Sequence, residues 1–253
     1  KSVSELTSTI AADEKAAAIV EVNSETDFVA KNDEFVGFVE TLAQMALEND
    51  AADMEAFMAL PYGEEGTVQE VLTSKIATIG ENMSIRRFEK VAGETVVSYI
   101  HGGRIGVIVE ADTNVVNDAV KEAMTNIAMQ VAALNPKYVA TSDVSEEYKA
   151  HEKEIIAAQI AQDPKMAGKP EKVIEGAIVG RLNKELKEVC LLEQAYVKAE
   201  DGKQTVAQYI AQVAKENGAN VSVKKFVRFE TGEGLEKKQE DFAAEVAAQM
   251  AGN

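Results

Sequence analysis

The chain contains the stretch Gly80-Glu81-Asn82-Met83-Ser84-Ile85-Arg86-Arg87-Phe88 and repeats it, at an offset of 218 − 80 = 138 residues, as Gly218-Ala219-Asn220-Val221-Ser222-Val223-Lys224-Lys225-Phe226. Both copies follow the pattern Gly-x-Asn-x-Ser, then a β-branched residue, two basic residues and Phe. Gly and Asn are turn residues, whereas β-branched and aromatic residues are typical of strands. Each copy therefore predicts a turn that leads into a strand.

A second, weaker repeat pairs Ile19-Val20-Glu21 with Ile108-Val109-Glu110, at an offset of 108 − 19 = 89 residues. A polar loop and a stretch of helical periodicity follow each copy. The apolar residues of each stretch share one helical face: Phe35, Val39, Leu42 and Ala46 in the first, and Val120, Met124, Ile127 and Val131 in the second. We therefore expect an α+β fold with two related subdomains, in which small antiparallel sheets are flanked by helices.

The two offsets differ by 138 − 89 = 49 residues, which indicates an insertion in the second copy. Residues 145–162 and 171–188 have helical periodicity, and the joint between them, 163–170, is rich in helix breakers. Two helices of similar length joined by a short loop predict an antiparallel hairpin. Its apolar stripe is thin and its flanks are charged, so it is either a surface excursion or an interaction arm.

Two strands are expected between the copies, at Thr95–Ile100 and Arg104–Glu110. The reversal His101-Gly102-Gly103 suits a hairpin turn and places His101 at its tip. At the other end of the chain, Phe242, Val246 and Met250 form one stripe of a predicted C-terminal helix. The expected organisation is an N-terminal core subdomain (1–93), the first part of a C-terminal core subdomain (94–140), a helical hairpin or coiled coil (141–190), the second part of that subdomain (191–230) and a C-terminal helical module (231–253).

Composition restricts the classes of function. The net charge of −17 opposes nucleic-acid binding as the main activity, because a phosphate-binding face needs an excess of Lys and Arg. No apolar run reaches the roughly 20 residues that cross a bilayer, and no signal-peptide core follows the first residues, so we expect no membrane association. One Cys among 253 residues fits a reducing compartment. The absence of an initiator Met indicates a fragment, a processed product or an excised domain.

The usual signatures of covalent chemistry and of cofactors are missing from the sequence. There is no phosphate-binding Gly-x-x-x-x-Gly-Lys-Ser/Thr loop, and two His with one Cys cannot assemble a common zinc site. Cys190 lies in the apolar run Val189–Leu192, which favours a buried structural Cys over a nucleophile. We therefore expect no catalytic residues, no bound metal and no cofactor, and a protein that is not an enzyme.

The stretch Ser24-Glu25-Thr26-Asp27-Phe28-Val29-Ala30-Lys31-Asn32 joins an apolar strand to an amphipathic helix. A strand-to-helix junction can present side chains without disturbing the core, and this one pairs a carboxylate with an aromatic ring. Two interpretations follow from the residues alone. Phe28 packs in its own core while Asp27 caps a helix N-terminus, or the pair is displayed for a partner.

Four segments together resemble the elongation factor Ts family, the guanine-nucleotide exchange factors of bacterial-type translation. They are Glu21–Asn32; Ile79–Asn82 with Ile85–Arg87; Tyr99–Val107; and Val189–Gln194 with the tail Phe226–Gly234. They occur in the family's order, around the same inserted hairpin. The family's opening ubiquitin-associated-like three-helix module has no counterpart here, which predicts a start in the linker after it and a reduced affinity for the partner.

The resemblance implies a partner, the GTPase elongation factor Tu, and a mechanism. The family's Thr-Asp-Phe-Val sequence pushes its ring into a pocket beside the switch II helix of the GTPase, which displaces Mg²⁺ and loosens the phosphate loop. On this chain the wedge would be Phe28, with Asp27 as a polar contact and Thr26 and Val29 as its frame.

The resemblance also implies partner contacts at His101, Phe242 and Val246, and self-association through the hairpin. It implies a bacterial cytoplasmic location, or an organellar matrix or stroma in a eukaryote. The alternative function is a non-exchanging scaffold or interaction protein of the same fold in a ribosome or polymerase complex. Exchange needs the Asp27-Phe28 pair, whereas scaffolding does not.

Overall fold

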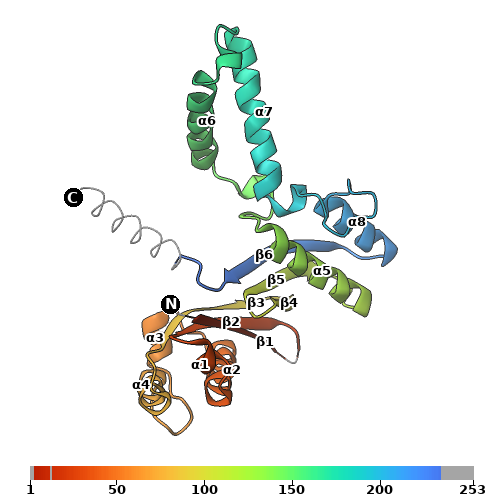
Figure 1. Cartoon of the computed structure of the whole chain (residues 1–253). Coiled ribbons are helices and arrows are strands. Elements are labelled where there is room, and N and C mark those ends of the chain that lie inside the picture. The colour runs from red at the N-terminus through yellow and green to blue at the C-terminus, as the bar shows by residue number, and fades with distance from the viewer. Residues whose placement is uncertain (1–2, 12, 235–253) are drawn as a thin grey trace, which may run out of the picture. The chain divides into compact units, whose positions relative to one another are not determined.

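The structure is a computed structural model that describes residues 3–11 and 13–234. It has the expected α+β architecture, with two three-stranded antiparallel sheets, flanking helices and an inserted helical hairpin (Figure 1). The predicted C-terminal helix, with Phe242 and Val246, lies outside the described residues. The strands are β1 (Val3–Ile10), β2 (Ala16–Ser24), β3 (Ser84–Ala92), β4 (Thr95–His101), β5 (Ile105–Thr113) and β6 (Val221–Glu230).

Among the described residues, the α-helices come in two runs, one between β2 and β3 and the other between β5 and β6. They are α1 (Asp27–Ala30), α2 (Asp33–Glu48), α3 (Met54–Met58), α4 (Val68–Ile79), α5 (Asp118–Leu134), α6 (Glu146–Ala161), α7 (Glu171–Val189) and α8 (Val206–Glu216). Three short 3₁₀ turns, Thr141–Asp143, Pro164–Met166 and Leu191–Glu193, occur between the later helices. Among the described residues, no helix combines the length and the apolar character that crossing a membrane requires.

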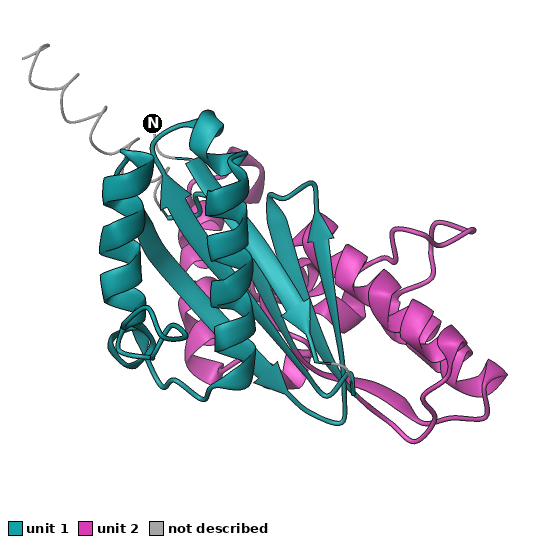
Figure 2. Cartoon of the chain, turned by 90° about the horizontal axis from the view of Figure 1, so that it is seen from below, with its two compact units in different colours: residues 1–111, 226–253 teal, residues 112–225 magenta. Residues whose placement is uncertain are grey.

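The described residues divide into two compact units (Figure 2): residues 3–11 and 13–111 with 226–234, and residues 112–225. Strand β6 crosses from the second unit into the first. The five-segment division expected from the sequence stays a prediction.

Strand β2 lies at the centre of the first unit, between β1 and β3. Ala18, Val20 and Val22 point into one core with helix α2, while Ala17 and Ile19 point into a second core. Successive residues of a strand face opposite sides, so a strand covered on both sides reads as a continuous apolar run. That is why 16–22 is almost entirely apolar.

Helix α2 covers one face of this sheet with Phe35, Phe38 and Leu42, each at most 2% exposed. It begins at a well-formed cap, since Asn32 Oδ1 accepts hydrogen bonds from the backbone N–H groups of Glu34 and Phe35. The opposite face of the sheet packs on Val96, Ile108, Val227 and Phe229, which belong to the second sheet.

The second sheet has the strand order β4-β5-β6. Strands β4 and β5 form the expected hairpin, in which His101 is the last residue of β4 and pairs with Ile105. Gly102 and Gly103 both have positive φ angles, 58° and 68°, which L side chains rarely adopt. The two glycines of the turn are therefore required by its backbone.

The nine-residue repeat forms the predicted turn and strand twice. Gly80 ends α4 in the left-handed conformation (φ 83°) and leads to β3, and Gly218 (φ 57°) follows α8 and leads to β6. Both glycines thus allow the chain to leave a helix and enter a strand.

The sequence analysis did not predict strand β1, because Val3–Ile10 is largely polar. In the structure only Leu6 of this strand is buried. It exists because β2 pairs with it along its whole length.

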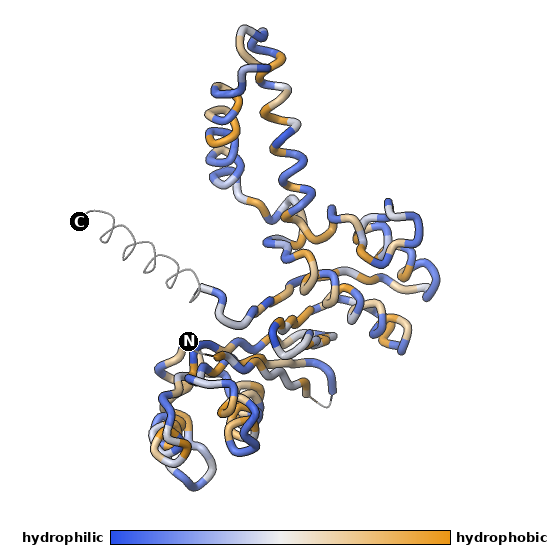
Figure 3. Tube along the Cα trace, viewed as in Figure 1, coloured by the Kyte–Doolittle hydropathy of each residue, from blue (hydrophilic) through white to orange (hydrophobic). Residues whose placement is uncertain are grey.

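In the second unit, α6 and α7 form the predicted antiparallel hairpin, and their bounds fall within one residue of those expected. Ile156, Ile160, Leu182 and Leu186 are buried between the helices, with Cys190 at the base. Figure 3 shows how sparse this apolar stripe is, since hydrophilic residues alternate with it along both helices.

Candidate partner-binding site

Helix α1 is a single turn that projects one aromatic ring into solvent. It lies between the end of β2 and the start of α2 (Figure 1). Phe28 is 90% exposed, more than any other large apolar residue that the structure describes, whereas its neighbour Val29 is 6% exposed and belongs to the α2 core. Val29 anchors the turn and Phe28 is displayed. The interpretation in which Phe28 packs in its own core is wrong.

Asp27 is also exposed and is the first residue of α1. Negative charge is favourable in the first turn of a helix, where backbone N–H groups are unpaired. Asp27 is not itself an N-cap residue, however, since Thr26 is the N-cap of α1 and Asn32 is the N-cap of α2. The interpretation of Asp27 as a cap is therefore wrong as well, and its exposed carboxylate belongs to the residue directly before Phe28.

Thr26 makes an unusual pair of hydrogen bonds for an N-cap residue. Its hydroxyl donates to Glu81 Oε1 at 2.6 Å and its backbone N–H donates to Glu81 Oε2 at 3.1 Å. Its side chain makes no capping bond to α1. One carboxylate, from the residue after Gly80, therefore holds the start of the turn through two atoms.

A second carboxylate, that of Glu21, lies on β2, the strand that precedes the α1 turn. Glu21 is fully buried, and its Oε1 accepts from Arg86 Nη1 at 2.8 Å and from Arg87 Nε at 2.6 Å. Its Oε2 accepts the backbone N–H of Gly232 at 3.0 Å. Arg87 also lies 4.2 Å from the centroid of the Phe229 ring and donates to the Glu230 carbonyl at 2.8 Å. This Glu21 cluster fixes the segment that follows β6.

His101 is exposed, and its Nδ1 lies 2.9 Å from the Tyr99 hydroxyl on the same strand. The structure therefore joins Thr26, Asp27, Phe28 and Val29 in one turn and places His101 on a separate hairpin. Phe242 and Val246 lie outside the residues that the structure describes.

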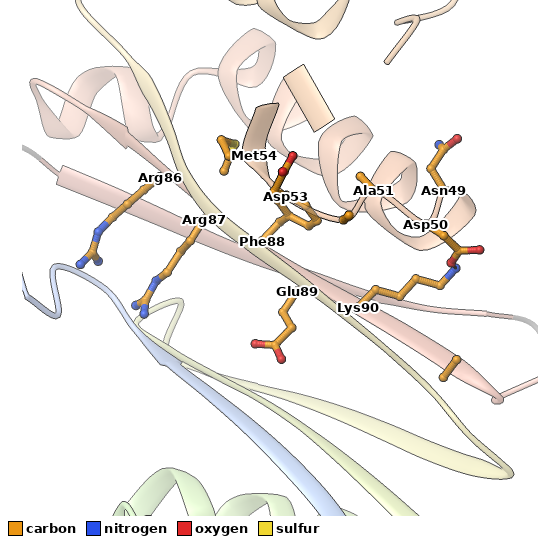
Figure 4. A pocket seen from close by; sticks show the side chains of 12 residues that line it. Asn49, Asp50, Ala51, Asp53, Met54, Arg86, Arg87, Phe88, Glu89 and Lys90 are labelled. Carbon is orange, nitrogen blue, oxygen red and sulfur yellow. Dashed lines mark hydrogen bonds and ion pairs between the residues drawn. The ribbon is translucent and has the colours of Figure 1, made fainter. Parts of the chain in front are cut away.

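A hollow of about 550 Å³ lies between β3 and the loop after α2 (Figure 4). Its charged groups are matched, since Lys90 Nζ lies 2.8 Å from Asp50 Oδ1 and Asp53 caps α3. The ring of Phe88 on its floor stacks on Phe57, with centroids 4.5 Å apart. None of the predicted site residues lines it. The candidate site is thus a protrusion on the surface.

No group of three or more His, Cys, Asp or Glu side chains in 3–11 and 13–234 has the arrangement of a metal site. The geometry supports contact with a partner through a displayed ring and carboxylate.

The family model of elongation factor TS matches residues 25–233. The chain is 49% identical over 240 residues to elongation factor Ts of Clostridioides difficile (strain 630), which covers 94% of this chain and 77% of that protein. It is 46% identical over 244 residues to elongation factor Ts of Clostridium botulinum (strain Eklund 17B / Type B), with 95% and 78% covered. It is 48% identical over 235 residues to elongation factor Ts of Syntrophotalea carbinolica, which covers 91% of this chain and 76% of that protein.

The chain belongs to the elongation factor Ts family. The predicted resemblance is confirmed, and with it the assignment to translation elongation in protein biosynthesis. The matched range begins one residue before Thr26 and ends one residue after Gly232. The α1 turn, together with Arg86, Arg87 and Gly232, therefore lies inside the part of the chain that matches the family model, whereas Glu21 lies four residues before it.

Two residues of this elongation factor Ts fold were missed as site residues by the sequence analysis, Glu81 and Glu21. Both belong to segments that carry the family resemblance, yet nothing local distinguishes them among 43 acidic residues. Their partners lie 55 and 211 residues away in sequence. For Glu81, the one indication in the sequence was the recurrence of Gly80–Phe88, which draws attention to the segment but does not show what Glu81 contacts.

Proposed function

We propose that the chain is a guanine-nucleotide exchange factor for elongation factor Tu. It acts by binding, without covalent chemistry or a cofactor of its own, and promotes GDP release by displacing Mg²⁺ and loosening the phosphate loop of the GTPase. The observation that carries the proposal is the exposure of Phe28, 90%, beside the buried Val29.

An exposed phenyl ring is energetically unfavourable for the free protein. Burying a Phe side chain is worth about 1.5–3 kcal/mol, so the ring forgoes that stabilisation until a partner covers it. A displayed ring on a fixed turn is suited to filling a preformed or induced pocket, as aromatic hot spots do. The adjacent Asp27 carboxylate gives the same surface a polar contact, and Thr26 and Val29 frame it.

The GTPase holds GDP through its phosphate loop and Mg²⁺. A binding protein accelerates release when it binds more tightly to the conformation in which those contacts are broken. An anchor worth about 2 kcal/mol in that conformation alone shifts the equilibrium more than tenfold. Phe28 therefore supplies enough differential binding energy to act as the wedge.

His101, Phe242 and Val246 are proposed as further contacts with the GTPase. Self-association is proposed through the hairpin of α6 and α7. The proposed location is the cytoplasm of a bacterium, which agrees with the bacterial sources of the relatives.

The test is the release of a fluorescent GDP analogue from elongation factor Tu, with the unaltered chain, with Phe28→Ala and with Ile10→Ala. Ile10 is an exposed apolar residue of the same unit, on β1, and serves as the matched control. Acceleration that falls more than tenfold in Phe28→Ala and persists in Ile10→Ala supports the proposal. Acceleration that Phe28→Ala leaves intact places the mechanism elsewhere, and no acceleration by the unaltered chain supports the scaffold alternative.

A further inference from the structure

The first residue of the displayed turn uses its polar atoms in an unexpected way. Thr is a favoured N-cap because its hydroxyl ordinarily accepts a hydrogen bond from an N–H of its own helix. Thr67 and Thr205 do this at the starts of α4 and α8. Thr26 instead donates its hydroxyl to Glu81, and α1 has no side-chain cap. The hydroxyl of Thr26 is thus used as a donor to a residue 55 positions away and not as an acceptor for its own helix.

A four-residue helix cannot hold its own direction. Helix nucleation is unfavourable, and isolated helices become stable only at about 12–15 residues. Val29 fixes the turn at one point by packing in the α2 core. One packed side chain does not by itself set the direction of the turn, and the Ser24 hydroxyl adds only a long hydrogen bond of 3.4 Å to the Thr26 carbonyl. The two bonds from Thr26 to the Glu81 carboxylate, at 2.6 and 3.1 Å, provide a second point and also an orientation.

Glu81 itself sits on a firm base. Helix α4 begins with a capping box between Thr67 and Glu70 and ends at Gly80, whose N–H bonds the Ile76 carbonyl at 2.9 Å. Gly80 adopts φ 83°, which turns the chain so that Glu81 leaves the helix toward Thr26. A half-buried carboxylate held by the end of a twelve-residue helix is a rigid support for a one-turn helix.

We propose that Glu81 is a positioning residue, which fixes the direction in which the α1 turn presents Phe28. Through its two bonds to Thr26 it adds an orientation to the packing of Val29, so the ring meets a partner already oriented. Orientation set before binding lowers the ordering cost of association. The effect on nucleotide release rests on the proposed function, whereas the positioning of Phe28 does not.

The first test measures local motion of the ring in the free chain. The chain has no Trp, so Phe28→Trp introduces a single fluorophore at the displayed position. In that background, time-resolved anisotropy is compared for Glu81→Gln, for Thr26→Val, which removes the hydroxyl alone, and for Thr26→Ser, which keeps it. The matched control is Glu64→Gln, which removes one charge from an exposed loop of the same unit. Circular dichroism checks that each variant is folded.

We expect the amplitude of the fast anisotropy decay to rise about twofold in Glu81→Gln, because two hydrogen bonds to a charged acceptor are lost or weakened. Thr26→Val should show a smaller rise, and Thr26→Ser and Glu64→Gln none. An unchanged decay in both Glu81→Gln and Thr26→Val would overturn the inference. So would a rise of equal size in Glu64→Gln.

The second test uses nucleotide release from the GTPase and a double-mutant cycle. Glu81→Gln should slow release by about tenfold in the unaltered background and add no further loss to Phe28→Ala, because residues that act through one another are not additive. Equal losses in both backgrounds would show that Glu81 acts independently of the ring and would overturn its role in exchange. If the unaltered chain fails to accelerate release, the proposed function fails and the anisotropy result still decides the positioning.

Discussion

Replacing Glu21 by Gln should destabilise the first unit by about 2–4 kcal/mol, although the two side chains have nearly the same shape. The carboxylate is fully buried and each oxygen is used: Oε1 accepts from Arg86 and Arg87, and Oε2 accepts from the Gly232 N–H. A Gln side chain keeps one acceptor oxygen and puts an NH₂ group in place of the other. In either orientation of the amide, that NH₂ group would face a hydrogen-bond donor: the two arginines at the Oε1 position or the Gly232 N–H at the Oε2 position.

The magnitude follows from these contacts. Hydrogen bonds that involve a charged group are worth about 1.5–3 kcal/mol each, and the substitution weakens two and removes one. Breaking a buried ion pair from one side costs about 3–5 kcal/mol when the remaining charge has no access to water. Here the side chains of Arg86 and Arg87 are 19% and 26% exposed, so water recovers part of the loss. The expected cost therefore lies somewhat below that of a fully buried pair.

The measurement is urea unfolding followed by circular dichroism, with hydrogen exchange of the β2 and β3 peptides to assign the loss to the first unit. Glu5→Gln is the control on the neighbouring strand, where Glu5 pairs with Val22. Partial burial, and next the charge of Glu40, raise the pKa of Glu5. A raised carboxyl pKa means that stability falls as pH rises from about 4.5 through the folded-state pKa.

Glu5→Gln should therefore stabilise the chain slightly at pH 7, by less than about 0.5 kcal/mol because water screens a half-exposed carboxylate. The same substitution is thus expected to have opposite signs on adjacent strands. A cost below about 1 kcal/mol for Glu21→Gln, or equal effects of the two variants, would refute the argument that Glu21 is stabilised by its three donors.

Three further outcomes are expected. Phe28→Ala should leave the melting temperature within about 1 °C of the original, because the ring is 90% exposed. Phe57→Ala, at a fully buried ring, should lower the free energy of unfolding by about 3–5 kcal/mol in calorimetry or urea unfolding. Similar losses for both variants would contradict the exposed position of Phe28. Gly106→Ala should cost about 1–3 kcal/mol, since its methyl group would collide with Ile19 Cδ1, and Ile19→Val should recover part of that loss in the double variant. Burial raises the pKa of Tyr196, so in an alkaline absorbance titration this phenol should ionise after the exposed tyrosines. Stability should fall as pH rises above about 10, because the tyrosine of the unfolded chain ionises first. Tyr196→Phe should remove the late-ionising component of the titration, and an unchanged titration curve would contradict the assignment.

The parts of the fold that could be predicted are those encoded by local periodicity. The α6–α7 hairpin has its breakers, caps and apolar positions within a short stretch, and its helices were placed within one residue. The turn and strand at Gly80 and Gly218 follow from glycines that only a left-handed turn explains. Strand β1 was missed because its stability comes from pairing with β2, which its own residues do not show.

The candidate site divides in the same way. The pair Asp27-Phe28 stands out in the sequence, but an aromatic residue between two apolar elements is ordinarily buried, and only the family resemblance favoured exposure. The roles of Glu81 and Glu21 could not be predicted, because both depend on contacts made across the fold by one carboxylate among many. The family resemblance favoured display of Asp27 and Phe28, and tertiary structure was needed to find what holds them.

The route of β6 has a consequence for the synthesis of the chain on the ribosome. The second unit is continuous in sequence, so it can fold as soon as residue 225 has left the exit tunnel. The first unit begins 111 residues earlier, yet its second sheet lacks its last strand until residues 226–230 emerge. At about 5–20 residues per second, the 119 residues between positions 111 and 230 delay it by about 6–24 s. During that interval Glu21 has not met Gly232, and water must solvate the oxygen that the glycine N–H later occupies.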